Sequence, residues 1–277
     1  MTANASAPRS LGRRPLAAAA VLLAAAACGR VEVGPRVPSL TALPALSLEL
    51  PADNAPLAAV LARVEANPAT AGVGSALDAY LAALARTGPR TRPGLYPTNG
   101  DGLAYLADAH MAWTIALGER RDLARLDPSA LRQVSFPLDG GTTTLRDIAA
   151  EIERRAPFEP RLALFLNPGW KGGAPLPESA LEGPSLEWQL ARHAVRCGGA
   201  GFWALDAGAH TLAVSAVSAS MWGLPEAPAE RARRLLGLVP PPPALGDAIA
   251  SVCGASLARC TIVSAPLDTA RLLVPVG

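Results

Sequence analysis

The sequence is poor in lysine, in aromatic residues and in recognisable catalytic motifs. Lys171 is the only lysine among 277 residues, and 4% of the residues are aromatic. No run of five or more Lys and Arg residues occurs, so we expect no nucleic-acid partner. A Gly-x-Ser-x-Gly sequence, a phosphate-binding loop and a His-Glu-x-x-His sequence are all absent. Motifs alone therefore predict neither a reaction nor a cofactor.

Charged residues are also scarce, at 17%, whereas half of the chain is apolar. This composition excludes disorder of the whole chain and leaves enough apolar residues for a sizeable core. Helical and strand-like segments follow one another without a βα rhythm, which predicts an α+β fold: a single mixed domain of helices packed on a small antiparallel sheet built from hairpins. The expected helices are residues 57–66, 76–86, 103–117, 145–156, 185–196, 229–236 and 245–252, and the expected strands are a hairpin over 136–144, then 202–206, 211–217 and 261–264.

The N-terminus resembles a secretion signal. Three basic residues, Arg9, Arg13 and Arg14, precede thirteen mostly apolar residues, 15–27. This run is too short to cross a hydrocarbon core, which takes about 20 helical residues. It ends at Cys28, and a small residue before such a cysteine resembles the bacterial lipoprotein box, in which the cysteine becomes the lipidated N-terminus.

We therefore expect residues 1–27 to be a signal peptide, residues 28–56 a proline-rich tether after a lipidated Cys28, and residues 57–277 a globular domain. The loss of three arginines with the signal changes the formal net charge from +2 to −1. The lipid would anchor the protein in the cell envelope, and Gly29 after the cysteine favours the outer membrane, facing the periplasm.

Two other readings of the N-terminus remain open. Ala25-Ala26-Ala27 also satisfies the small-x-small site of ordinary signal cleavage, which would release a soluble secreted protein. Arg13-Arg14 is alternatively a twin-arginine signal, although Pro15 and Leu16 fit that pattern poorly.

Three cysteines remain if Cys28 carries lipid: Cys197, Cys253 and Cys260. Export exposes them to an oxidising compartment, and only six residues separate Cys253 from Cys260. This close pair is a disulfide candidate; two buried thiols are the alternative.

The histidines do not indicate a metal site. His193 and Cys197 have the i, i+4 spacing of two ligands on one helix face, but they share that face with Leu186 and Leu190. No second cluster of ligands is evident, so we expect no metal. His110 likewise belongs to the apolar stripe of the helix over 103–117 and is expected in the core.

Four segments resemble, in the same order, the family called domain of unknown function 547. Residues 104–112 (AYLADAHMA) are similar to its Ala-Phe-Trp-Ile-Asn-Ala-Tyr-Asn-Ala helix, and residues 144–150 to its Ser-Leu-x-Asp-Ile-Glu-His block. Residues 160–166 (PRLALFL) and 167–176 (NPGWKGGAPL) are similar to its Pro-Arg-Ile-His-Phe-Ala-Leu block and to the Asn-Cys-Gly-x-x-Ser-Cys-Pro-x-Leu block that follows.

The resemblance implies a degenerate thiol-enzyme-like site, because the family's recurring Asn, His and Cys are the makings of a thiolate nucleophile with its base. The matching positions here hold Asp108, Ala150, Ala163, Pro168 and Gly173. None of these supplies a thiol or an imidazole. The resemblance therefore favours a protein without catalysis.

Two hypotheses follow. The first is a lipid-anchored binding or structural module whose partner, a protein or a small molecule, is unknown. The second is a hydrolase with a rebuilt active site near Asp108, Trp170 and Lys171. A residual cleft in either case would contain Asp108, Asn167, Trp170 and Lys171.

Overall fold

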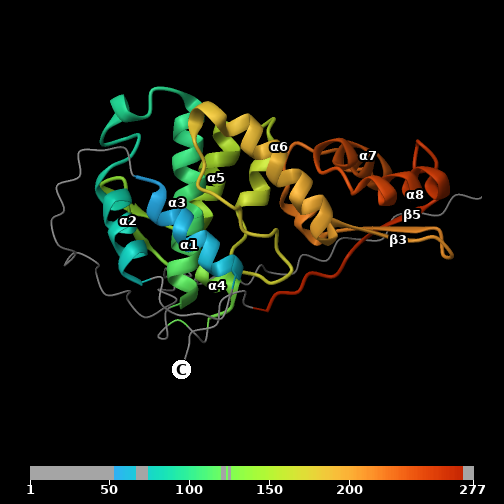
Figure 1. The fold of residues 1–277 in the computed structure, drawn as a ribbon, viewed down its shortest axis with the longest axis horizontal. Helices are drawn as coiled ribbons and strands as arrows, with labels where there is room; N and C mark the ends of the chain where they lie inside the picture. The colour runs from blue at the N-terminus through green and yellow to red at the C-terminus, as the bar shows by residue number, and fades with distance from the viewer. Residues whose placement is uncertain (1–52, 67–73, 120–122, 124–125, 271–277) are drawn as a thin grey trace, which may run out of the picture. The chain divides into compact units, whose positions relative to one another are not determined.

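The order of helices and strands follows the sequence closely and confirms an α+β fold (Figure 1). A computed structural model describes residues 53–66, 74–119, 123 and 126–270, all of which belong to one compact unit. The predicted signal peptide and lipidated cysteine lie outside the described residues. The helices are α1 (Ala55–Ala66), α2 (Gly74–Arg86), α3 (Asn99–Glu119), α4 (Pro128–Leu131), α5 (Leu145–Arg155), α6 (Leu186–Cys197), α7 (Pro228–Leu238) and α8 (Pro243–Cys253), with 3-10 turns η2 (Pro93–Leu95), η4 (Pro160–Phe165), η5 (Gly183–Ser185) and η7 (Ala216–Ser220).

Helix α3 packs against α2, α5 and η5, and its side chains are buried on every side. The sequence predicted a single apolar stripe, but residues 102–115 are all buried, because the many glycines and alanines of this helix let neighbouring segments approach closely. His110 is in the core, as predicted, and burial lowers its pKa to about 3. Trp113 stacks on Phe136 with 4.3 Å between ring centroids.

Strands β1 (Phe136–Leu138) and β2 (Gly141–Thr143) form the hairpin that the sequence predicted, and a two-residue turn joins them. Asp139 and Gly140 both have positive φ, 49° and 70°, as a type I′ turn requires. The Asp139 carboxylate accepts hydrogen bonds from the backbone N–H groups of Arg90 (2.7 Å) and Thr91 (2.8 Å). The turn therefore anchors the loop that follows α2.

The sheets differ from the single antiparallel sheet that was expected. Strands β3 (Trp203–Asp206) and β4 (Thr211–Val214) form an antiparallel hairpin, but β5 (Thr261–Ser264) joins β4 in parallel, in a sheet separate from β1 and β2. A parallel pair needs a long connection, and here the chain passes through η7, α7 and α8 between β4 and β5. A disulfide joins Cys253, at the end of α8, to Cys260, next to β5, with 4.9 Å between Cα atoms.

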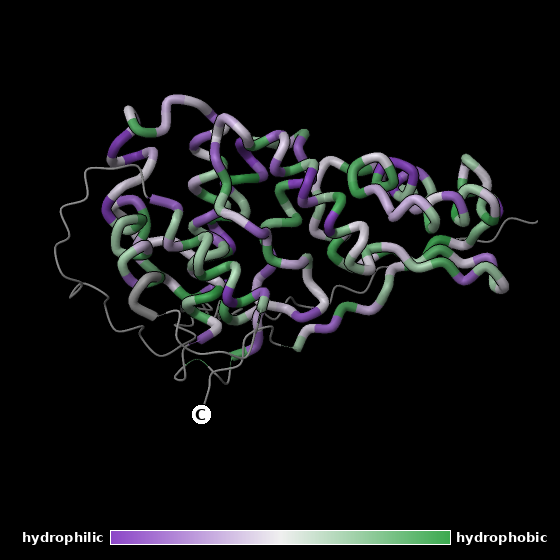
Figure 2. The backbone as a smooth tube through the Cα atoms, viewed as in Figure 1, coloured by the Kyte–Doolittle hydropathy of each residue, from purple (hydrophilic) through white to green (hydrophobic). Residues whose placement is uncertain are grey.

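Helix α6 is amphipathic. Hydrophobic and hydrophilic residues alternate along it (Figure 2), and its buried face, with Leu190, His193 and Cys197, packs on η4. Ser185 stands at the N-cap position of this helix, but its side chain makes no capping bond, and its hydroxyl lies 3.5 Å from the carbonyl oxygen of Glu182. Among the described helices, none is long and apolar enough to span a membrane.

Candidate functional site

The loop NPGWKGGAPLP, residues 167–177, is organised by the side chain of Asn167. This buried amide makes four hydrogen bonds inside the loop. Its Oδ1 accepts from the N–H groups of Gly169 (3.0 Å) and Trp170 (2.9 Å). Its Nδ2 donates to the carbonyl oxygens of Trp170 (3.1 Å) and Ala174 (2.8 Å). Two donors and two acceptor positions are all that an amide offers, so Asn167 has none left for a ligand.

Close contacts explain the glycines of this loop. A Cβ atom on Gly173 would lie 2.4 Å from the Asn167 amide, and one on Gly172 would lie 2.5 Å from the backbone nitrogen of Asp268. Gly169 has a φ of +90°, a region that disfavours other residues. The chain after β5 also pairs with the loop, since Gly172 N–H donates to the Asp268 carbonyl oxygen at 2.9 Å. The glycines therefore serve backbone geometry.

The four residues predicted for a residual cleft differ in their burial. Asp108 is 2% exposed, and its carboxylate oxygens accept from the N–H of Leu181 at 2.9 and 3.2 Å. Burial raises the pKa of Asp108 well above its usual range, although the Leu181 hydrogen bond opposes the shift. Trp170 is half-buried and Lys171 is exposed. Of the two alanines at positions that resemble recurring histidines of the family, Ala150 is exposed and Ala163 is buried in η4.

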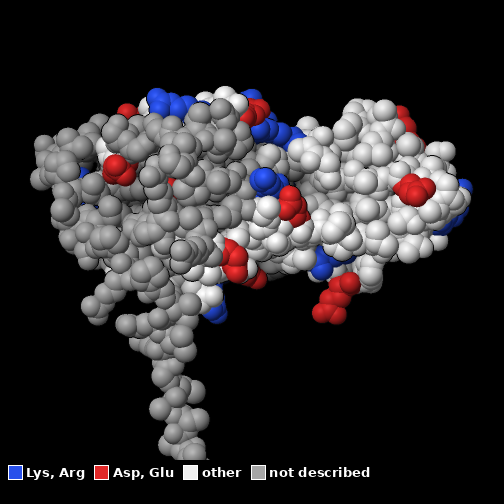
Figure 3. Space-filling view, turned by 90° about the horizontal axis from the view of Figure 1, so that it is seen from below, with Lys and Arg blue, Asp and Glu red and all other residues white. Residues whose placement is uncertain are grey.

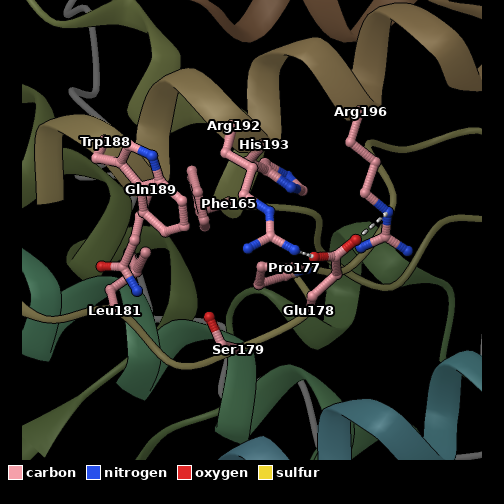
Figure 4. Close-up of a pocket in the computed structure, with 10 residues that line it drawn as sticks. All are labelled: Phe165, Pro177, Glu178, Ser179, Leu181, Trp188, Gln189, Arg192, His193 and Arg196. Atoms are coloured by element: carbon pink, nitrogen blue, oxygen red, sulfur yellow. Dashed lines mark hydrogen bonds and ion pairs between the residues drawn. The ribbon is translucent and has the colours of Figure 1, made fainter. Parts of the chain in front are cut away.

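A pocket lies elsewhere, beside α6, where this helix faces η4 and the segment 177–181 (Figure 4). It holds about 340 Å³ of empty space, including the part open to solvent. None of the four predicted cleft residues lines it. The lining residues are Phe165, Pro177, Glu178, Ser179, Leu181, Trp188, Gln189, Arg192, His193 and Arg196.

Charged groups of both signs gather on one side of this pocket. Glu178 forms an ion pair with Arg192 and lies 3.9 Å from the Nε atom of Arg196, so that its carboxylate stands between the two guanidinium groups (Figure 4). Arg196 also forms an ion pair with Glu65 of α1. The Arg192 guanidinium carbon lies 5.3 Å from the ring centre of Trp188, a cation–π contact. On the face drawn in Figure 3, positive and negative side chains also lie side by side.

The apolar side of the pocket includes an aromatic side chain that solvent reaches. Trp188 is 60% exposed on the outer face of α6. Phe165 and His193 lie in the interior and contact each other with tilted rings, 4.3 Å between their centroids. Such an exposed indole next to a concave surface is a common anchor for a bound partner.

His193 and Cys197 contact each other, with 3.6 Å between Sγ and Nε2. Burial raises the pKa of the Cys197 thiol to about 12 and lowers the pKa of His193 to about 4, so both groups are neutral at pH 7. A neutral thiol is a poor nucleophile. Within the described part of the chain, no three His, Cys, Asp or Glu side chains are grouped so that they could hold a metal ion.

Sequence reasoning missed Trp188, Arg192 and Glu178. The signal was present, because Trp188 and Arg192 have the i, i+4 spacing on the polar face of an amphipathic helix, where a tryptophan is out of place. The contribution of Glu178 depends on how the loop folds back onto α6 and has no signature in the sequence.

No protein-family model matches this chain, and neither the curated proteins nor the solved structures give a match. The likeness to domain of unknown function 547 stays a hypothesis that depends on the four sequence segments.

Proposed function

We propose that this protein is a lipid-anchored module of a bacterial cell envelope that binds a partner in the pocket beside α6 without catalysing a reaction. The lipid anchor depends on the N-terminal sequence that ends at Cys28. We further infer that the domain descends from a thiol-enzyme-like ancestor of the domain of unknown function 547 family and has lost its catalytic groups.

The observation that carries the binding function is the exposed Trp188 at a pocket that also holds Arg192 and Arg196. An aromatic side chain and arginines are the residues that most often dominate binding energy when they become desolvated. The absence of catalysis is supported by the neutral state of Cys197 and His193. The alternative hydrolase near Asp108, Trp170 and Lys171 has no supporting observation, because Asp108 is buried and its carboxylate accepts a hydrogen bond from the N–H of Leu181.

Photocrosslinking in cells tests the binding function. A benzophenone amino acid placed at Trp188 should give a discrete adduct with a partner. The matched control is the same substitution at Phe158, which is 92% exposed and does not line the pocket. Equal adducts at both positions, or none at Trp188, would contradict the proposal.

A second measurement tests the absence of catalysis. Purified protein should not hydrolyse ester or amide substrates above the rate of a blank. Turnover that disappears in Asp108→Ala, while the fold is retained, would instead establish the hydrolase.

A further inference from the structure

We propose that the pocket beside α6 binds an anion attached to a flat apolar group, and that Glu178 occupies the place of this anion in the unliganded protein. This inference rests on the proposed binding function and adds the chemical class of the ligand, a carboxylate or phosphate on a planar ring. The charge, the apolar wall and the position of Glu178 support it separately.

The charges that line the pocket favour an anion. Arg192, whose side chain is 59% exposed, pairs with Glu178, whereas Arg196 is also paired with Glu65 of α1, so Arg192 is the guanidinium that an incoming anion would reach. His193 adds no charge at neutral pH, because burial lowers its pKa to about 4. A guanidinium has five N–H donors, and in the described part of the chain Arg192 uses one of them, in its hydrogen bond to Glu178. Donors therefore remain for an incoming carboxylate or phosphate.

The opposite wall favours a flat apolar group. Phe165, Pro177, Leu181 and Trp188 supply apolar surface next to the charged groups. An aromatic ring placed against Trp188 would cover an indole that is 60% exposed and would bring its acidic substituent toward Arg192. A free anion without an apolar group would leave the exposed part of Trp188 in contact with water.

Glu178 stands where the anion of such a ligand would bind. Its side chain is 45% exposed and belongs to the loop segment, outside any helix or strand, so it can move aside without disturbing the core. Binding then exchanges one ion pair of Arg192 for another. Replacing the Glu178 carboxylate removes a group that competes with the ligand for Arg192. The affinity for the anion should then rise by up to about fivefold, which corresponds to the free energy of a partly exposed ion pair.

Fluorine NMR on the full-length protein labelled with 5-fluorotryptophan measures this binding. The chain has five tryptophans, and the Trp188 resonance is assigned from Trp188→Phe. The probes are phenylacetate and phenyl phosphate, with 2-phenylethanol as the uncharged analogue. We expect both anions to shift the Trp188 resonance in a saturable way and 2-phenylethanol to bind at least fivefold more weakly.

Two variants locate the charge effect. Glu178→Gln should tighten phenylacetate binding about two- to fivefold, and Arg192→Met should weaken it. Glu187→Gln is the matched control, since Glu187 is also a carboxylate of this region but pairs with Arg161 and does not line the pocket. It should leave the affinity unchanged.

Three results would overturn the inference: no saturable shift with either anion, equal binding of 2-phenylethanol, or equal effects of Glu178→Gln and Glu187→Gln. Each is distinguishable from failure of the proposed function. A crosslink at Trp188 together with any of these results would keep a binding site and remove only its preference for an anion.

Discussion

Asn167→Asp tests whether one buried amide holds the whole loop 167–177. The new side chain keeps both acceptor positions that face the N–H groups of Gly169 and Trp170. It loses the two hydrogen bonds that Nδ2 donates to the carbonyl oxygens of Trp170 and Ala174. A carboxylate oxygen would then face those carbonyl oxygens.

The expected loss of folding free energy follows from these contacts. A buried hydrogen bond contributes about 1 kcal/mol, and a buried acceptor left without a donor costs about 1–3 kcal/mol. Because two bonds are lost together, we expect Asn167→Asp to destabilise the protein by about 3 kcal/mol. For a domain of this size, that loss lowers Tm by about 6–12 °C.

Urea unfolding followed by circular dichroism at pH 7 measures the loss. The matched control is Asn99→Asp, an exposed position at the start of α3, where a carboxylate faces the positive end of the helix. We expect this control to stay within about 0.5 kcal/mol of the unchanged protein.

A local assay separates loosening of the loop from global unfolding. Lys171 is the only lysine, so a lysine-specific protease has a single cleavage site in the chain, and it lies in this loop. Under native conditions Asn167→Asp should be cleaved faster than the unchanged protein, whereas Asn99→Asp should not. Stability and cleavage rate both equal to those of the unchanged protein would refute the organising role of Asn167.

Three further predictions concern the anchor, the cysteines and the buried acid. Cys28→Ser should abolish both labelling by a fatty-acid analogue and retention in membranes, because two or three acyl chains at one site make anchoring stable; a variant that still sediments with membranes would contradict the anchor. Mass spectrometry after alkylation without reduction should find Cys253 linked to Cys260. Cys197 should react with iodoacetamide only after unfolding, because burial raises the pKa of its thiol to about 12. Labelling of all three cysteines in the folded protein would contradict both predictions. Burial raises the pKa of Asp108 above its value in the unfolded chain. As the pH rises above ~4, Asp108 therefore ionises in the unfolded chain but not in the folded protein. The free energy of unfolding then falls by up to about 1.4 kcal/mol per pH unit until the folded-state pKa is reached. Asp108→Asn should remove this slope in urea titrations between about pH 4 and pH 8; an unchanged slope would show that Asp108 is ionised in the fold.

Local pattern was enough to predict most elements. The strand over 261–264 has the predicted bounds, and α1, α2 and α5 agree within two residues, because their ends coincide with turns, prolines or caps that act over a few residues. The hairpin was predictable from the Asp139-Gly140 pair, since few residues tolerate two consecutive positive φ values. The core position of His110 was predictable from its apolar neighbours.

Sequence alone did not reveal which residues would share a site. The family resemblance grouped Asp108, Trp170 and Lys171. In the structure Asp108 is buried and accepts a hydrogen bond from the N–H of Leu181, and Lys171 is exposed. Composition predicted a loop at 167–177, but the four hydrogen bonds of Asn167 depend on the three-dimensional course of that loop.

Local sequence therefore determined the helices, the hairpin and the apolar face of α6, because capping, periodicity and turn geometry act between residues a few positions apart. Only tertiary structure decided the direction of β5, which depends on the crossover through α7 and α8. It also decided the pocket. Glu178 pairs with Arg192, fourteen positions away in the chain, and Arg196 pairs with Glu65, 131 positions away. No local pattern in the sequence encodes these two contacts.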